Sequence, residues 1–179
     1  MKKLLACAVS LAVLAAAPAY AALQPGAKAP DFTAPGAMAG KAFTFSLKEA
    51  LKHGPVVLYF YPAAFTSGCT VEAHDFAEAA DQYKALGATL IGVTAGNTDR
   101  LVEFSTSDCR SKFATAAVTK DIIKSYDTVL PQKPDWSNRT SYVIAPNGKI
   151  IFTYSDLDPS KHVEMTLDAL KKWHDDHGK

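Results

Sequence analysis

A continuous run of apolar, β-forming residues constrains the fold of this 179-residue chain more than any other feature. Residues Pro55 to Tyr61 read PVVLYFY, and Pro62 ends the run. A strand that is apolar on both faces needs a packed layer on each side, as in a parallel sheet. A helical pattern follows over residues 68–86, with Thr66 available as its cap and Gly87 as its stop. The sequence therefore predicts a buried strand that leads directly into a covering helix.

The same alternation continues along the chain. We expect a buried strand over residues 88–94, a helix over 98–107, a short strand over 113–118 and a short helix over 119–126. Strands over 141–145 and 149–154 flank Pro146-Asn147-Gly148, which is typical of a hairpin. A last helix follows Asp158, with Pro159 at its first position.

Two segments show no clear pattern. Residues 22–40 are rich in Ala, Pro and Gly, and we expect an irregular segment there, followed by a short strand over 41–47 and a short helix to Lys52. Residues 130–137 hold two prolines and are expected to form a loop. The order of elements predicts an α/β fold of thioredoxin-like type, with a central mixed β-sheet flanked by helices.

The first 21 residues have a composition of their own. Lys2 and Lys3 precede an apolar run over residues 4–17, and Ala19-Tyr20-Ala21 fits a signal peptidase site. The run is too short to span a membrane, so we expect a cleaved secretory signal over 1–21 and one domain over 22–179, in the periplasm or secreted. With 19 Lys+Arg against 18 Asp+Glu, the charge gives no reason to expect a nucleic-acid partner, nor a membrane partner after cleavage.

Cleavage would leave two cysteines, Cys69 and Cys109, in an oxidising compartment. For any secreted pair, one structural disulfide is the ordinary interpretation. Cys69, however, lies where the buried strand passes into the start of a helix, and free N–H groups and the helix dipole stabilise a thiolate there. Thr66 is close enough in sequence for its hydroxyl to meet the sulfur, and Pro62 could shield the pocket from water.

These residues carry a resemblance to a known family. The segment from Tyr59 to Ala73, YFYPAAFTSGCTVEA, resembles the P-x-x-x-T-x-x-C active-site segment of peroxiredoxins, and most closely the bacterioferritin-comigratory (PrxQ) type. Residues 26–32 are similar to the family's N-terminal segment. Residues 139–144, with Arg139, resemble the strand that bears its active-site arginine, and residues 148–150 resemble the turn that follows.

The resemblance implies a thiol peroxidase that reduces hydrogen peroxide and organic hydroperoxides. Cys69 would be the peroxidatic cysteine, whose thiolate attacks peroxide and becomes a sulfenic acid. Thr66 would hydrogen-bond the peroxide or the sulfur, Arg139 would favour the thiolate and polarise the O–O bond, and Pro62 would wall the pocket. The resemblance implies no metal and no organic cofactor, a thioredoxin-like or other dithiol reductant as partner, and a monomer. Glu72 would orient Arg139 or only cap the helix.

One departure from the family concerns resolution of the sulfenic acid. Many PrxQ-type members carry a resolving cysteine five residues after the peroxidatic one, but His74 occupies that position here. The resemblance then assigns resolution to Cys109 through an intramolecular disulfide with Cys69. Such a bridge needs the two Cα atoms within about 7 Å, so we expect local unfolding of the first helical turns. The alternative is a one-cysteine enzyme that is resolved by an external thiol.

Other functions of a thioredoxin-like fold remain to be compared. A disulfide oxidoreductase needs Cys-x-x-Cys, but this chain has Cys69-Thr70-Val71-Glu72. A copper-delivery module needs Cys-x-x-x-Cys, but Ala73 fills its second position. A non-catalytic binding protein needs no motif at all, and a measurement of peroxide turnover would distinguish it from a peroxidase.

Overall fold

The computed structural model describes residues 22–177 of the chain. One sheet contains seven strands in the order β2-β1-β5-β4-β3-β8-β9. The strands of that sheet are β1 (Thr33–Met38), β2 (Lys41–Ser46), β3 (Val56–Phe60), β4 (Thr89–Thr94), β5 (Ala114–Ala117), β8 (Thr140–Ile144) and β9 (Ile150–Ser155). The helices are α1 (Leu47–Leu51), α2 (Ser67–Ala85), α3 (Leu101–Ser107), α4 (Lys120–Ser125) and α5 (His162–His177), and single 3₁₀ turns precede α3 (Thr98–Arg100) and α5 (Pro159–Lys161).

The sheet is mixed, as the sequence predicts. Strand β3 pairs in parallel with β4, and β4 pairs in parallel with β5. On its other side β3 pairs with β8 in antiparallel register, and β8 pairs with β9 in the same way. All five residues of β3 are buried, because helices cover both faces of the sheet.

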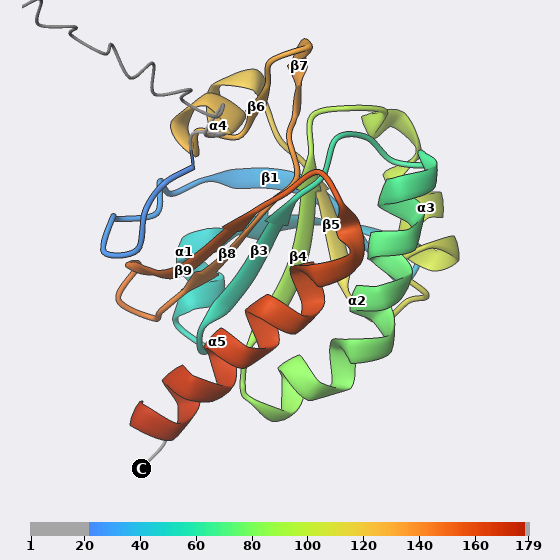
Figure 1. Cartoon of the computed structure of the whole chain (residues 1–179). Helices are drawn as coiled ribbons and strands as arrows, with labels where there is room; N and C mark the ends of the chain where they lie inside the picture. Colours follow the sequence, from blue (N-terminus) through green and yellow to red (C-terminus); the bar gives the residue numbers. More distant parts are fainter. Residues whose placement is uncertain (1–21, 178–179) are drawn as a thin grey trace, which may run out of the picture.

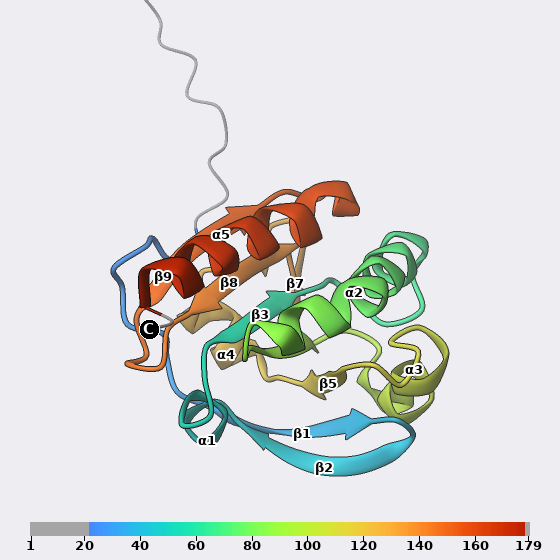
Figure 2. The same ribbon diagram turned by 90° about the horizontal axis from the view of Figure 1, so that it is seen from below.

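Two apolar cores lie on the two faces of the sheet. Val57 and Tyr59 of β3 point into the core that contains α2 and α5, whereas Val56 and Leu58 point into the core with α1 and α4. Figures 1 and 2 both show α2 and α5 side by side on one face. The Tyr83 hydroxyl joins the two helices, 2.7 Å from the Thr166 hydroxyl. The element order and the alternation of buried side chains thus agree with a three-layer α/β fold.

The expectation of an irregular segment over residues 22–40 is wrong for its last third. Residues Thr33–Met38 form β1, which pairs with both β2 and β5. Ala39 and Gly40, with φ of 49° and 77°, form the two-residue turn into β2. Gly36 is needed because a Cβ there would lie 2.9 Å from the Phe43 ring. Its Ala, Pro and Gly residues have low strand propensity, so pairing with neighbouring strands determines this strand.

The expectation of a loop over residues 130–137 is also wrong. Strands β6 (Val129–Leu130) and β7 (Lys133–Ser137) form a separate antiparallel ribbon that turns at Pro131-Gln132. Pro134 is exposed on this ribbon, where an outer edge requires no N–H donor. Prolines therefore do not argue against a strand in such a position.

The predicted secretory signal lies outside the described residues. Within residues 22–177, no helix is both long and apolar enough to cross a membrane.

Candidate active site

The antiparallel register of β3 and β8 brings the segment after β3 close to the segment before β8, although Cys69 and Arg139 are 70 positions apart. Phe60, at the end of β3, pairs with Thr140, at the start of β8. The chain leaves β3, passes through a short loop and enters α2, so Cys69 lies in the first turn of that helix. Arg139 immediately precedes β8 and therefore lies at the same end of the sheet.

Cys69 and Arg139 are in direct contact in this arrangement. The Arg139 Nη2 atom lies 3.7 Å from the Cys69 Sγ atom and donates to it. Both side chains are buried, with 1% of Cys69 and 5% of Arg139 exposed. Cys69 is a free thiol, and the first turn of α2 directs unpaired backbone N–H groups toward this region. A guanidinium and a helix N-terminus both favour negative charge on the sulfur.

Arg139 is held by two further contacts. Its Nε donates to the Leu157 carbonyl oxygen at 3.0 Å, and its Nη1 forms an ion pair with a Glu72 carboxyl oxygen. Gly68 leaves room for the guanidinium, because a Cβ there would lie 3.1 Å from Nη2. Burial opposes the charge on Arg139, but Glu72 and Cys69 raise the pKa of the guanidinium. Arg139 therefore stays cationic beside the thiol.

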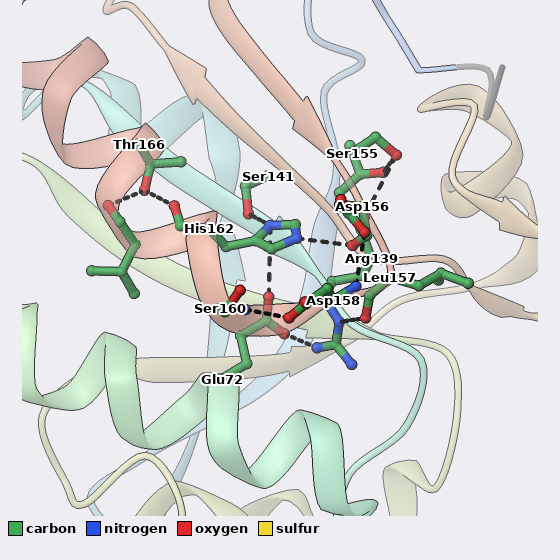
Figure 3. A network of polar contacts seen from close by, with 12 residues as sticks. Glu72, Arg139, Ser141, Ser155, Asp156, Leu157, Asp158, Ser160, His162 and Thr166 are labelled. Atoms are coloured by element: carbon green, nitrogen blue, oxygen red, sulfur yellow. Dashed lines mark hydrogen bonds and ion pairs between the residues drawn. The ribbon is translucent and has the colours of Figure 1, made fainter.

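Glu72 begins a buried polar network that extends to α5 (Figure 3). Its Oε1 atom lies 3.7 Å from Nδ1 of His162 and has no hydrogen-bond partner among the described residues. The His162 Nδ1 is 2.8 Å from the Ser141 hydroxyl, and Nε2 is 2.9 Å from the Asp156 carbonyl oxygen. Burial lowers the pKa of His162 to about 4, so the imidazole is neutral near pH 7.

The carboxyl group of Glu72 is itself strongly perturbed. Burial raises the pKa of Glu72 to about 8, while the charge and hydrogen bond of Arg139 oppose that rise. An oxygen of either a carboxylate or a carboxylic acid can accept from Arg139, so the contact alone does not require an ionised Glu72.

The loop between β3 and α2 is fixed by hydrogen bonds from side chains to its backbone carbonyl oxygens. Each of its first four carbonyl oxygens accepts a hydrogen bond from a side chain. The donors and acceptors are Ser137 to Tyr61 (2.7 Å), Thr94 to Pro62 (3.1 Å), Thr66 to Ala63 (3.0 Å) and Asn97 to Ala64 (3.0 Å). The loop is thereby held in one conformation before Cys69 begins the helix.

Thr66 and Pro62 both lie in this loop. Thr66 occupies the N-cap position of α2, but its side chain makes no capping bond. Its only hydroxyl proton goes to Ala63, so toward a substrate the oxygen could act as an acceptor. Pro62 is half-buried. The predicted role of Thr66 toward peroxide or sulfur, and that of Pro62 as a wall, stay predictions.

Phe65 stands out within the same loop because it is a non-glycine residue in the left-handed region, with φ of 62°. Such a conformation costs about 1–3 kcal/mol and persists where surrounding contacts hold it. Here the Arg100 guanidinium lies 4.2 Å from the centre of the Phe65 ring, and Phe104 packs edge-on at 5.2 Å.

Cys109 lies just beyond the end of α3 and is 0% exposed. Burial, and to a lesser extent the neighbouring Asp108 charge, raises the pKa of the Cys109 thiol well above its usual range. Both cysteines belong to the same core cluster and both are free thiols. The Thr70 hydroxyl donates to the Asp108 carboxylate at 2.6 Å, so residues adjacent to the two cysteines are hydrogen-bonded to each other.

Of the residues predicted from the sequence, the structure thus brings Cys69, Arg139 and Glu72 into contact, with Thr66 and Pro62 in the adjoining loop. Sequence reasoning missed His162, Ser141 and the Thr70–Asp108 bond, because their partners come from distant elements and follow no short motif. Among residues 22–177, no cluster of three or more His, Cys, Asp or Glu side chains is arranged to hold a metal ion.

The AhpC/TSA family model matches residues 25–153, which include β1 through β8 and the first four residues of β9. The chain belongs to the AhpC/TSA family. Among curated proteins it is 29% identical over 147 residues to chloroplastic peroxiredoxin Q of Oryza sativa subsp. japonica, covering 82% of this chain and 66% of that protein. It is 25% identical over 122 residues to peroxiredoxin Bcp of Escherichia coli K12, covering 65% of this chain and 78% of that protein.

Solved structures of family members have the same fold. Peroxidoxin BcpB from Mycobacterium tuberculosis superposes with a TM-score of 0.74 at 25% identity, covering 84% of this chain and 97% of that one. The reduced 2-Cys peroxiredoxin of Plasmodium vivax superposes with a TM-score of 0.76 at 20% identity, covering 87% and 99%. The prediction of a thioredoxin-like fold, and the resemblance to peroxiredoxins, are confirmed.

Proposed function

We propose that this AhpC/TSA family member is a thiol peroxidase in which Cys69 is the peroxidatic cysteine. The contact of Arg139 Nη2 with the Cys69 sulfur, at 3.7 Å in a buried site at a helix N-terminus, is the observation that supports it most. A fixed cation and free backbone donors stabilise both the thiolate and the negative charge that develops on the leaving oxygen. Hydrogen peroxide and organic hydroperoxides are the substrates.

In the proposed reaction the Cys69 thiolate attacks one peroxide oxygen. An S–O bond forms and the O–O bond breaks, so the sulfur is oxidised to a sulfenic acid and the second oxygen leaves as hydroxide or alkoxide. Arg139 stabilises both charges, Thr66 accepts a hydrogen bond from the incoming peroxide, and Pro62 shields the pocket from water.

We assign resolution to Cys109, which is the second cysteine of residues 22–179. Its thiol would displace water from the Cys69 sulfenic acid and form an intramolecular disulfide, which an external dithiol reductant would return to two thiols. Because Cys109 is fully buried, the bridge requires local unfolding around the end of α3 and the first turn of α2. If this opening does not occur, an external thiol resolves Cys69 in a one-cysteine cycle.

We further propose that the protein acts as a monomer in the periplasm or after secretion, with residues 1–21 removed. The charged start, apolar run and Ala19-Tyr20-Ala21 site support export. Intact mass of the protein recovered from the periplasm of an expressing bacterium tests this: a chain that starts at Ala22 is expected, and an uncleaved chain in the cytoplasm would contradict it.

Turnover of peroxide with a dithiol reductant tests the proposed activity. Wild-type protein should consume peroxide catalytically, and Cys69→Ser should not. The Cys109→Ser variant should turn over only when a small external thiol is supplied; equal turnover with the dithiol alone would indicate the one-cysteine cycle. If peroxide is not consumed by the wild type, a non-catalytic binding protein of the same fold is the better description.

A further inference from the structure

Three ionisable groups are buried together, and their charges do not balance if all of them ionise. Cys69, Glu72 and Arg139 are 1%, 0% and 5% exposed. One guanidinium can neutralise a thiolate or a carboxylate, whereas both anions together would leave an uncompensated negative charge away from water. We propose that Glu72 is a neutral carboxylic acid while Cys69 is a thiolate, and that Glu72 ionises when oxidation makes Cys69 neutral. This inference rests on the proposed function.

The position of His162 supports a proton on Glu72. The Asp156 carbonyl can only accept a hydrogen bond, so the proton of the neutral imidazole is on Nε2, 2.9 Å away. Nδ1 then accepts from the Ser141 hydroxyl at 2.8 Å, so His162 offers no proton to the unpartnered Oε1 of Glu72, 3.7 Å away. A carboxylate with one oxygen unpartnered in a buried site is unfavourable, and a proton on Glu72 removes that charge.

The charged groups around Glu72 favour the same state. On its own helix Asp75 adds a negative charge that raises the pKa of Glu72, in addition to the larger effect of burial. From the segment between β9 and α5, Asp156 and Asp158 lie near His162 and add no positive charge. Arg139, from the start of β8, is the one cation in contact with Glu72 among the described residues. A single guanidinium charge cannot fully compensate both a Glu72 carboxylate and the Cys69 thiolate.

The exchange of charge also balances the protons of the peroxidase step. Before reaction the site holds a thiolate, a guanidinium and the Glu72 acid. With hydrogen peroxide, the sulfur gives two electrons as the S–O bond forms and the O–O bond breaks, and the leaving hydroxide takes the Glu72 proton to become water. Afterwards the site holds a sulfenic acid and a Glu72 carboxylate paired with Arg139. Net charge is zero before and after, so the buried site never carries an unpaired ion.

A Glu72→Gln substitution tests the inference, because glutamine has the shape and neutrality of the acid. Its amide oxygen can accept from Arg139, as an oxygen of the acid does. Because glutamine cannot supply the proton that the leaving hydroxide takes, the test compares the pH profiles of the two proteins rather than their rates at one pH. Above about pH 8 the wild-type rate should fall as Glu72 ionises and competes for Arg139, whereas the rate of the variant should not.

The control is Glu78→Gln, which removes an exposed carboxylate from the same helix and should keep the wild-type profile. Persistence of the alkaline fall in a folded Glu72→Gln protein, as judged by circular dichroism, would overturn the inference.

Infrared spectroscopy gives a second readout that depends neither on the fold of that variant nor on peroxide chemistry. Reduced wild-type protein in D₂O should show the carbonyl stretch of a buried carboxylic acid, and Cys69→Ser, which has no anion at the site, should lack it. An acid band that is equal in both proteins, or absent from both, would contradict the inference. If the band behaves as expected but peroxide is not consumed, the charge exchange stands and the proposed function fails.

Discussion

Arg139 is the residue on which the site depends, because each of its nitrogens has a different partner. Nε donates to Leu157, Nη1 pairs with Glu72 and Nη2 reaches the Cys69 sulfur. A planar guanidinium can serve three directions at once, whereas an ammonium is a compact point charge on a flexible stem. Shape as well as charge therefore determines which residue can occupy this position.

An Arg139→Lys substitution should consequently impair the reaction although it keeps the charge. We expect the second-order rate constant for oxidation of Cys69 by hydrogen peroxide, measured by stopped-flow fluorescence, to fall about 10²–10³-fold. The matched control is Arg110→Lys, since Arg110 is half-exposed and pairs with Glu78 away from the thiol. A rate within threefold of wild type for Arg139→Lys would show that a point charge suffices.

His162 makes a separate contribution to the pH dependence of stability. Its pKa is about 4 in the folded protein and 6.5 without burial, so the unfolded chain binds a proton first as the pH falls. The contribution of His162 to the free energy of unfolding is thus fully present above pH 6.5. It is lost as the pH falls toward 4, by up to about 3 kcal/mol. The difference in the free energy of unfolding between wild type and His162→Gln, measured in urea, should therefore be about 3 kcal/mol smaller at pH 4 than at pH 7. A constant difference across this range would contradict a neutral buried imidazole.

At the scale of single residues, the sequence predicts the reactive cysteine and its neighbours but misses the residues that position them. Cys69, Thr66 and Pro62 are close in sequence, and Arg139 follows from the resemblance. Glu72 is detectable because it lies three residues after Cys69 on a helix and so shares its face. His162 contacts Glu72 only through packing of α5 on α2, so no local pattern marks it.

At the scale of elements, the first turn of α2 and the end of α3 are joined by the Thr70–Asp108 hydrogen bond of 2.6 Å. The acceptor is charged and only 5% exposed, so loss of this bond should cost about 1.5–3 kcal/mol. Because Thr70 follows Cys69 and Asp108 precedes Cys109, the bond opposes the local unfolding that a disulfide between the two cysteines requires.

Thr70→Val keeps nearly the same side-chain shape but removes the hydroxyl. It should therefore loosen the first turn of α2 and the end of α3. We expect faster amide hydrogen exchange in residues 67–71 and 106–111 of the reduced protein, measured by mass spectrometry, and faster disulfide formation after oxidation. Thr106→Val is the control, because its exposed hydroxyl bonds only to a carbonyl of its own helix. Unchanged exchange in Thr70→Val would mean that packing alone, rather than this bond, holds the two ends.

Gly68 lets stability and activity be separated within the same element. Alanine favours a helix over glycine by up to about 1 kcal/mol, but a Cβ at this position would lie 3.1 Å from Arg139 Nη2. Gly68→Ala should leave the melting temperature unchanged or higher while it displaces the guanidinium by a few tenths of an ångström. The rate of Cys69 oxidation should fall roughly 3–10-fold. A faster or equal rate would mean that the guanidinium tolerates the shift.

The elements that sequence patterns predict well are those with strong periodicity or continuous apolarity, such as β3, β4 and α2. Strand β1 and the β6–β7 ribbon are missed because Ala, Gly and Pro have low strand propensity. Their pairing comes from partners elsewhere in the chain, which local propensity does not contain.

At the scale of the whole molecule, the sheet topology creates the site. Because β8 runs antiparallel to β3 and β9 antiparallel to β8, the end of β3, the start of β8 and the end of β9 lie together. Cys69 and Leu157 follow, and Arg139 precedes, these three strand ends. The class of fold can be predicted from the order of elements, but the strand order that unites these residues cannot.

We propose, as the central claim, that Cys69 is the thiol that reacts with peroxide. Reduced protein that lacks residues 1–21 should be treated with one equivalent of hydrogen peroxide, its free thiols blocked, and its intact mass and peptides analysed. We predict rapid loss of two hydrogens and a crosslinked peptide that joins Cys69 to Cys109; a sulfenic acid on Cys69 with Cys109 free would keep the claim and exclude resolution by Cys109. Two blocked, unoxidised thiols would contradict the claim.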